Sequence, residues 1–215
     1  MTPRVTLAVT ARVLTQLRRD HRTLALLLVM PCLLMTLLAW IFADSHSGVF
    51  DRVAPGLLAL FPFIVMFLVT SVTTLRERTG GTLERLLAMP MGRLDLILGY
   101  ALAFGVVACV QAALAVALSV GALGLDIAGS VWLLGAIAVL DAVLGTALGL
   151  FVSAFARTEF QAVQFLPALV IPQMLLCGLL VARDQLPRAL ELVSDVLPLS
   201  YAVDAMTAVS TGDAT

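Results

Sequence analysis

The sequence predicts an all-α polytopic membrane protein with an N-terminal amphipathic helix and five transmembrane helices. Its 215 residues are 61% hydrophobic and 13% charged, whereas a soluble domain is usually about 45–50% apolar and about 25% charged. The apolar residues gather in five runs long enough to cross a bilayer, and most charges lie between these runs. A water-soluble fold of this size has no use for so much apolar surface, so the composition indicates that lipid is the solvent.

The first element is predicted from residues 1–23 and is a cytoplasmic amphipathic helix. The apolar run that follows the basic region is too long for a secretory signal peptide. An interfacial helix on an anionic membrane surface fits this pattern, and so does a basic flank that only sets the topology. The helix would carry apolar residues along one face and arginines mostly elsewhere: Val5, Val9, Val13, Leu14 and Leu17 against Arg4, Arg12, Arg18, Arg19 and Arg22.

The transmembrane domain is predicted over residues 24–182. Each apolar run reaches the length of about 20 residues that a helix needs to cross the hydrocarbon layer. The third and fourth runs exceed this length, so we expect them to tilt, to break at Gly121 or Gly124, or to project into water. The predicted spans are residues 24–43, 53–75, 95–124, 127–156 and 162–182.

The orientation follows from the arginines, because the protein has no lysine. With the N-terminus in the cytoplasm, the inner segments hold ten arginines and the outer segments three. Cytoplasmic loops carry the excess of basic residues, so we expect the N-terminus inside. Five spans then leave residues 183–215 outside, and we expect a sixth span beyond Thr215. The lack of lysine and the richness in Ala, Leu, Val and Arg are typical of a GC-rich bacterial genome, which indicates a bacterial cytoplasmic membrane.

The main cytoplasmic loop, residues 76–93, concentrates charge. It holds four of the thirteen arginines and two of the four glutamates. Residues 82–89 are good helix formers bounded by glycines and a proline. Two turns of helix are not stable alone, so either the membrane surface and span ends or a cytoplasmic protein must pack on them. The apolar stripe at helical spacing is formed by Leu83, Leu86 and Leu87.

Three stretches in this order resemble the ABC-2-type export permeases. The stretch "RERTGGTLERLLAMPMGRLDLILGY" resembles the first cytoplasmic loop of that family. The stretch "GTALGLFVSAFARTEFQAVQFLPALVIPQMLLCG" resembles its fourth span, short inner loop and proline-bearing fifth span, and "LPLSYAVDAM" resembles the outer loop before a sixth span. The daunorubicin-resistance and multidrug branch, in which permease and ATPase are separate chains, is the most similar.

The resemblance implies that residues 82–89 form a coupling helix that seats in a cleft of a separate ABC ATP-binding subunit. It also implies a second permease chain, with ATP and magnesium bound by the ATPase and no cofactor in this chain. The absence of lysine agrees, since a GxxxxGK[ST] phosphate-binding loop needs one. The implied contacts with the ATPase are anchors at Leu83, Leu86 and Leu87 and polar contacts at Glu77, Thr82, Glu84 and Arg85.

Polar residues inside the spans are candidates for a substrate path. Asp141 lies near the middle of the fourth span, where a carboxylate costs about 2.5–3.5 kcal/mol on insertion scales. It contacts a cationic substrate, acts as a polar hinge in the export path, or accepts a hydrogen bond from a neighbouring helix, with Gln111 and Gln164 as candidate partners. Together with Gln173 these residues form the predicted path.

Glycine and proline patterns predict further features of the spans and the outer segment. Gly145 and Gly149 form a GxxxG pair that lets another helix approach closely. Pro167 and Pro172 are expected to kink or break the fifth span. Residues 183–200 carry an apolar face at helical spacing and a wet face, which predicts an interfacial or re-entrant helix. The apolar face is Leu186, Leu190, Val193 and Leu197, and the wet face is Arg188, Glu191 and Asp195.

The function predicted from the sequence is the permease subunit of an ATP-driven exporter of a hydrophobic or amphipathic compound, such as a drug, a lipid or a glycoconjugate. A membrane enzyme is disfavoured, because the chain has no HExxH or GxSxG motif, no paired intramembrane aspartates and no metal-ligand spacing among its cysteines. An ion-coupled secondary carrier using Asp141 is the alternative. The net charge of −1 gives no indication of nucleic-acid binding.

Overall fold

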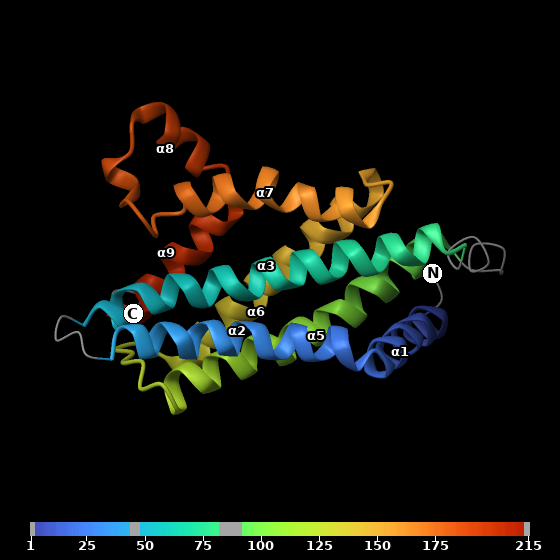
Figure 1. Cartoon of the computed structure of the whole chain (residues 1–215), viewed down its shortest axis with the longest axis horizontal. Helices are drawn as coiled ribbons and strands as arrows, with labels where there is room; N and C mark the ends of the chain where they lie inside the picture. The colour runs from blue at the N-terminus through green and yellow to red at the C-terminus, as the bar shows by residue number, and fades with distance from the viewer. Residues whose placement is uncertain (1–2, 44–47, 82–91, 213–215) are drawn as a thin grey trace.

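The computed structural model describes residues 3–43, 48–81 and 92–212, and within these ranges all regular structure is helical (Figure 1). Five of the described helices are long and apolar enough to cross a membrane. This confirms the predicted all-α membrane fold and its five spans. The five helices are α2 (His21–Ile41), α3 (Val49–Thr79), α5 (Arg93–Gly121), α6 (Val131–Phe155) and α7 (Glu159–Leu176).

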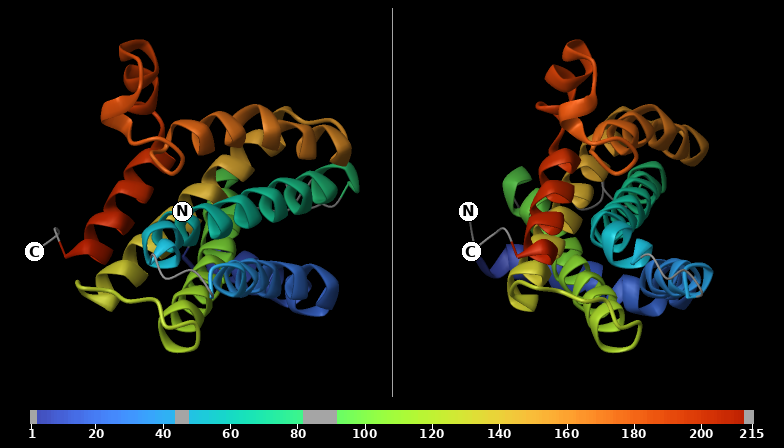
Figure 2. Two further views of the ribbon diagram at one scale, coloured as in Figure 1. Left: turned by 60° about the vertical axis from the view of Figure 1, so that its left-hand side comes forward. Right: turned by 90° about the vertical axis from the view of Figure 1, so that its left-hand side faces the viewer.

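Helix α3 lies at the centre of the bundle, in contact with α2, α5, α6 and α7 (Figures 1 and 2). Its closest neighbour is α6. A Cβ atom added at Gly145 would lie 2.5 Å from the carbonyl oxygen of Phe63, and one at Gly149 would lie 2.5 Å from that of Phe67. Side chains larger than hydrogen therefore do not fit here. A step of four residues along α6, from Gly145 to Gly149, corresponds to a step of four residues along α3, from Phe63 to Phe67. The two helices therefore run in the same direction.

Helix α1 (Pro3–Arg19) packs along the first turns of α5. Its apolar residues Val9, Val13 and Leu17 are only 3–5% exposed. The face that the sequence placed on the membrane surface is thus buried against protein. The physical reason is the length of α5, because its first turns offer an apolar surface that α1 covers.

The opposite end of α5 is closed by a loop. The helix ends at Gly121, and Gly124 adopts φ = +69°, a conformation that glycine reaches without strain. The backbone amides of Ala128 and Gly129 then donate to the carbonyls of Ser210 and Val209 at 3.0 and 3.1 Å. The α5–α6 loop therefore meets the end of α9 (Pro198–Thr211).

Helix α7 continues through Pro167 and Pro172 without interruption. It ends at Leu176, six residues before the end of the predicted span at 182. The chain turns away at Gly178, where φ is +90°, a value that favours glycine. The prolines therefore do not break this helix, and the glycine ends the helical segment early.

The outer segment contains two short helices, of which the first lies within the predicted range of residues 183–200. After the 3₁₀ turn η1 (Arg183–Gln185), helix α8 (Arg188–Ser194) and helix α9 meet at an angle of 86°. Leu190 and Val193 on the predicted apolar face are 42% and 47% exposed, whereas Ser194 is buried and donates to the carbonyl of Leu176 at 2.7 Å. The predicted apolar face of α8 is therefore largely exposed, and Ser194 holds the end of α8 against α7.

We call α8 and α9 together the outer hairpin. Arg183 holds the outer hairpin together. Its guanidinium donates to Asp195 after α8 and to Asp204 on α9. It also lies 5.5 Å from the ring centroid of Tyr201, within the range of a cation–π contact. One side chain therefore ties η1 to both limbs of the hairpin.

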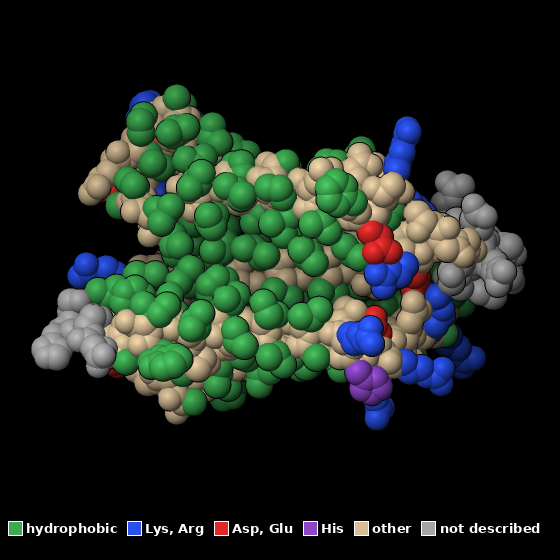
Figure 3. Space-filling model, in the orientation of Figure 1, with side chains coloured by type: hydrophobic (Ala, Val, Ile, Leu, Met, Phe, Trp, Pro, Cys, Tyr) green, Lys and Arg blue, Asp and Glu red, His purple; other side chains and the backbone are tan. Residues whose placement is uncertain are grey.

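The surface separates by polarity along the long axis. Figure 3 shows apolar side chains over the middle of the visible face and arginines gathered at the end where α1 lies. Each of the five long helices except the central α3 also carries large apolar side chains that are exposed. A broad exposed apolar surface is expected of a protein surrounded by lipid. We refer to the two ends as the arginine-rich end and the α9 end.

Candidate functional site at the arginine-rich end

Three consecutive residues at the end of α3, Arg76, Glu77 and Arg78, contact different neighbouring helices. The Nε and Nη2 atoms of Arg76 each donate to the carboxylate of Glu159 on α7 at 2.9 Å. Arg78 donates to the carbonyl oxygen of Ala154 on α6 at 2.8 Å. We call these three residues the α3 hub, because their contacts join α3 to the surrounding bundle just before the chain leaves the helix.

Glu77 makes the buried contact of the α3 hub. Its side chain is 5% exposed and accepts a hydrogen bond from the hydroxyl of Tyr100 on α5. Arg12 of α1 places Nη2 at 3.5 Å from the Glu77 carboxylate and Nη1 at 3.5 Å from the Tyr100 oxygen. A buried charge is stable only when it is paired and hydrogen-bonded, so Glu77 holds α1, α3 and α5 in one arrangement.

A second set of contacts attaches α1 to the start of α5. The hydroxyl of Thr6 donates to one Asp95 carboxylate oxygen at 3.1 Å, and the other oxygen accepts the backbone amide of Gly92 at 3.3 Å. Asp95 therefore caps the helix and binds α1 with the same side chain. Nearby, the Thr10 hydroxyl donates to the carbonyl of Gly99 at 3.2 Å.

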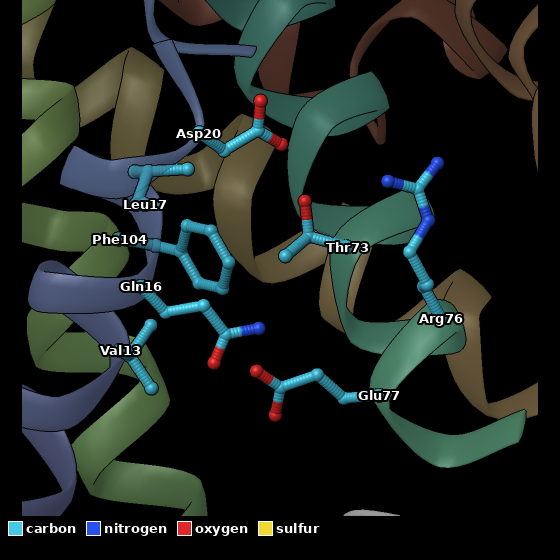
Figure 4. Close-up of a pocket in the computed structure, with 8 residues that line it drawn as sticks. All are labelled: Val13, Gln16, Leu17, Asp20, Thr73, Arg76, Glu77 and Phe104. Carbon is cyan, nitrogen blue, oxygen red and sulfur yellow. The ribbon is translucent and has the colours of Figure 1, made fainter. Parts of the chain in front are cut away.

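A cavity of about 160 Å³ lies among α1, α3 and α5 (Figure 4). Glu77 and Gln16 point toward one another across it, and Phe104 and Val13 form its apolar side. One carboxylate oxygen of Glu77, Oε1, is buried and has no hydrogen-bond partner among the residues described. The α3 hub is therefore backed by a partly polar space that is not filled by side chains.

The corner between α1 and α2 is fixed by Asp20. The hydroxyl and the backbone amide of Thr23 donate to its carboxylate at 2.7 and 3.2 Å, which caps the first turn of α2. The side-chain hydrogen bond from Thr23, followed by the backbone bond, lowers the pKa of Asp20 below its ordinary value of 3.8. Asp20 therefore remains ionised at neutral pH and fixes the direction in which α2 leaves α1.

These contacts lie at the two helix ends that flank one loop. Helix α3 ends at Thr79 and α5 begins at Arg93, and Glu77 and Tyr100 join the two helices within two turns of those ends. A force applied to the connecting segment would act on α3 and α5 as a unit and would reach α1, α6 and α7 through the α3 hub and Asp95. The arrangement suits the transmission of movement.

The predicted coupling helix lies outside the described residues, and its role stays a prediction. This concerns Thr82, Leu83, Glu84, Arg85, Leu86 and Leu87. Glu77, which the sequence assigned to a polar contact with a partner, is described and is used inside the chain. Its contacts with Tyr100 and Arg12 leave 5% of the side chain exposed.

The predicted path residues do not form one cluster of hydrogen bonds. Asp141 is 1% exposed, and neither of its carboxyl oxygens has a hydrogen-bond partner in the described part of the chain. Neither Gln111 nor Gln164 supplies the hydrogen bond to Asp141 that was one of the alternatives predicted for it. The Gln111 amide donates instead to the carbonyl of Leu27 on α2 at 2.9 Å, and Gln164 is exposed on α7. Gln173 is buried and donates within α7, to Leu169 at 3.1 Å.

Sequence reasoning missed Thr6, Tyr100 and Asp95 as site residues. Asp95 carries a signal that could have found it, since it stands three residues after Gly92 at the start of a helix, where an acidic cap is favoured. Tyr100 carries no such signal. A tyrosine within an apolar run is ordinary, and its role depends on Glu77 of another helix.

Comparison with known proteins places these features in a family. The profile of the "ABC-2 type transporter" family matches residues 4–210. The match therefore extends from α1 through α9 and includes the α3 hub, the α1 contacts and the outer hairpin.

Individual relatives are similar over most of this chain. "Probable multidrug ABC transporter permease YbhR" of Escherichia coli (strain K12) is 29% identical over 152 residues, which are 71% of this chain and 41% of the relative. "ABC transporter G family member 20" of Dictyostelium discoideum is 27% identical over 166 residues, 77% of this chain and 23% of the relative. "Inner membrane transport permease YhhJ" of Escherichia coli (strain K12) is 27% identical over 157 residues, which are 72% of this chain and 42% of the relative. The chain thus spans less than half the length of these relatives.

Proposed function

The chain belongs to the ABC-2 type transporter family and is a membrane transporter subunit, and on that premise we propose that it is the permease of an exporter driven by a separate ATP-binding subunit. Its cargo would be a hydrophobic or amphipathic compound, such as a drug, a lipid or a glycoconjugate. The observation that carries this proposal is the α3 hub, because a permease without its own ATPase needs a stiff element through which a partner can move it.

The proposed docking site is the loop of residues 76–93. Leu83, Leu86 and Leu87 would anchor in a cleft of the ATPase, which binds ATP and magnesium, and Glu84 and Arg85 would set the register. Only a well-packed element transmits a displacement instead of absorbing it. The bonds of Glu77 and of Arg76 supply that packing at the helix end adjoining the loop.

Transport would follow from movement of the helices relative to a second permease chain. Displacement of the loop would tilt α3 and α5 together, and the Arg76–Glu159 and Arg78–Ala154 contacts would carry α7 and α6 along. In the proposed orientation the arginine-rich end faces the cytoplasm, in agreement with the excess of basic residues there. The roles of Asp141, Gln111, Gln164 and Gln173 along the path remain predictions.

The test is a pull-down of the tagged full-length protein from native membranes, followed by mass spectrometry. We expect a stoichiometric ATP-binding subunit with the wild type and its loss with Leu86→Asp, while the amount of permease in the membrane stays the same. Val196→Asp is the matched control, because Val196 is 80% exposed between α8 and α9, away from the arginine-rich end. Normal recovery of the ATPase with Leu86→Asp would contradict the proposed docking site.

A second candidate, an ion-coupled secondary carrier, is favoured by one observation. Asp141 is 1% exposed and neither of its carboxyl oxygens is hydrogen-bonded within the described residues, and ionisable groups inside a membrane often mark ion pathways. Proteoliposomes prepared with and without the ATPase separate the two functions. Transport driven by a proton gradient and lost in Asp141→Asn would establish the carrier, and transport only with ATPase and ATP would exclude it.

A further inference from the structure

An apolar groove of about 250 Å³ lies where α1 meets α2 and α5. Val106 and Val110 are 48% and 52% exposed, so the groove opens toward the surroundings of the bundle. Its lining is apolar except for one charged side chain. The apolar residues that line it include Leu14, Leu24, Leu28, Val106 and Val110, and the polar one is Arg18.

Arg18 places a positive charge beside these apolar walls. It is exposed and makes no ion pair with any residue that the structure describes. Arg19 and Arg22 stand on either side of the same corner, and Asp20 supplies one negative charge there, which the Thr23 cap already uses. The corner therefore holds three arginines against one aspartate and carries a net positive charge.

The groove on the other side of α2 gives a comparison within the same molecule. It measures about 410 Å³ and lies between α2 and α3, with walls that include Met30, Leu34 and Leu68. Its charged residue is Arg76, which is bound to Glu159 through two hydrogen bonds of 2.9 Å. Of these two grooves beside α2, only the one at Arg18 combines apolar walls with an unpaired cation.

We propose that the groove at Arg18 binds one anionic phospholipid, with an acyl chain between α2 and α5 and the phosphate beside Arg18. Arginine recognises phosphate through paired N–H donors, and basic residues near a membrane surface attract anionic lipids. In a zwitterionic lipid the positive group of the headgroup offsets the charge of the phosphate, which weakens its attraction to Arg18. A soluble anion would not contact the apolar walls of the groove. The lipid belongs to the leaflet beside which the α1–α2 corner lies.

The site connects lipid to the α3 hub through one shared side chain. Leu17 lines both this groove and the cavity behind Glu77. A bound lipid would therefore hold α1 against α5 next to the contacts of Glu77. The lipid composition of the membrane would then influence how tightly α1 is packed against the other helices.

The experiment uses native mass spectrometry of the purified full-length protein in detergent, without any ATPase or ATP. Phosphatidylglycerol, phosphatidylcholine with the same acyl chains, and glycerol 3-phosphate are titrated separately. We expect the first phosphatidylglycerol to bind about fivefold more tightly than phosphatidylcholine, as one arginine beside an anionic headgroup supports, and glycerol 3-phosphate not to bind. Arg18→Gln should abolish the preference, and Val110→Trp should weaken binding of both lipids by filling the groove.

Two matched variants serve as controls. Arg188→Gln removes an exposed arginine on α8, and Met30→Trp adds the same bulk to the groove between α2 and α3, so both should keep the wild-type preference. Equal binding of the two phospholipids, a preference that survives Arg18→Gln, or tight binding of glycerol 3-phosphate would each overturn the proposal. Because the assay contains no partner, its outcome is independent of the pull-down with Leu86→Asp.

Discussion

At the scale of single residues, Glu77 concentrates the interactions at the arginine-rich end. Its carboxylate is 5% exposed and receives the Tyr100 hydroxyl from α5 and the Arg12 guanidinium from α1. In water each of these groups would be solvated separately. Inside the protein they are stable only together, because an unpaired buried polar group costs about 1–3 kcal/mol.

A double-mutant cycle tests this coupling. Glu77→Leu and Tyr100→Phe should each lower the free energy of unfolding by about 1–3 kcal/mol, because each leaves a buried partner unsatisfied. The double mutant should lose less than the sum, with a coupling energy of about 0.5–3 kcal/mol. The measurement is thermal or denaturant unfolding of the purified protein in detergent. Pairing Tyr100→Phe with Glu191→Gln on α8 is the control, and additivity in the first pair would exclude the contact.

Asp20 gives a prediction with a defined pH dependence. Its pKa is lowered in the folded protein, chiefly by the hydroxyl of Thr23, so the unfolded state binds a proton more readily. Its contribution to stability is therefore complete well above its ordinary pKa of 3.8 and disappears as the pH falls through the lowered value. Asp20→Ala should cost about 0.5–2 kcal/mol at neutral pH, the usual value of a helix N-cap.

The measurement is the unfolding midpoint of the wild type and the variant between neutral and acidic pH. The difference between them should shrink below pH 3.8. Asp20→Asn keeps one acceptor oxygen for the cap but loses the charge and the second acceptor, so its stability at neutral pH should lie between those of the wild type and Asp20→Ala. A difference between wild type and Asp20→Ala that does not change with pH would show that the ionised carboxylate is not the source of the stabilisation.

At the scale of elements, the pairing of α3 with α6 depends on two glycines that allow the backbones to touch. The GxxxG pattern is visible in the sequence, but its partner helix is not. The structure identifies it as α3, since Phe63 and Phe67 present the carbonyl oxygens that Gly145 and Gly149 approach. Both phenylalanines are fully buried, so the helix that carries the α3 hub is packed tightly along its length.

Gly145→Ala should therefore lower the free energy of unfolding by about 1–3 kcal/mol, the usual cost of overpacking a well-filled contact. The same helix provides a matched control. Gly135→Ala adds a methyl group where nothing lies within 4 Å, and should be neutral or stabilising because alanine favours a helix over glycine by about 1 kcal/mol. Thermal unfolding of the two variants checks the prediction, and equal effects would argue against the close contact.

At the scale of the whole molecule, the arginines and the apolar band define how the protein sits in a membrane. Most of the described arginines lie toward the end that holds α1 and the ends of α3 and α6, and fewer lie toward the α9 end (Figure 3). The basic end should face the cytoplasm, which is where an ATP-binding subunit would dock. Orientation and partner docking are therefore linked, and an inverted protein would place the α3 hub on the wrong side.

Cysteine labelling in whole cells tests the orientation. In a background with Cys32, Cys109 and Cys177 replaced by alanine, Val196→Cys should react with a maleimide that does not cross membranes. Arg19→Cys should react only after the cells are permeabilised, because it lies at the arginine-rich end. Both positions are exposed in the structure, so access to the thiol depends on the side of the membrane alone. The reverse pattern would invert the topology.

The sequence by itself determined that the protein is surrounded by lipid, that it is helical and that it has five spans. These properties depend on the composition of about 20 consecutive residues, because that composition decides whether a segment prefers lipid or water. It also singled out the charged stretch that contains the α3 hub. It did not show that the apolar residues Val9, Val13 and Leu17 of α1 are buried against protein, or that the outer segment bends between α8 and α9. In both places an apolar pattern predicts burial but does not say against what.

Only the tertiary structure decided the partners. Glu77 and Tyr100 are 23 positions apart, and Thr6 and Asp95 are 89 apart, so no local pattern connects them. Asp141 shows the converse, because neither of its carboxyl oxygens has a hydrogen-bond partner among the described residues and Gln111 donates to Leu27 instead. Local composition fixes the environment that a side chain requires, whereas the group that satisfies it is supplied by whichever helix packs alongside, and that is settled by the packing of the complete bundle.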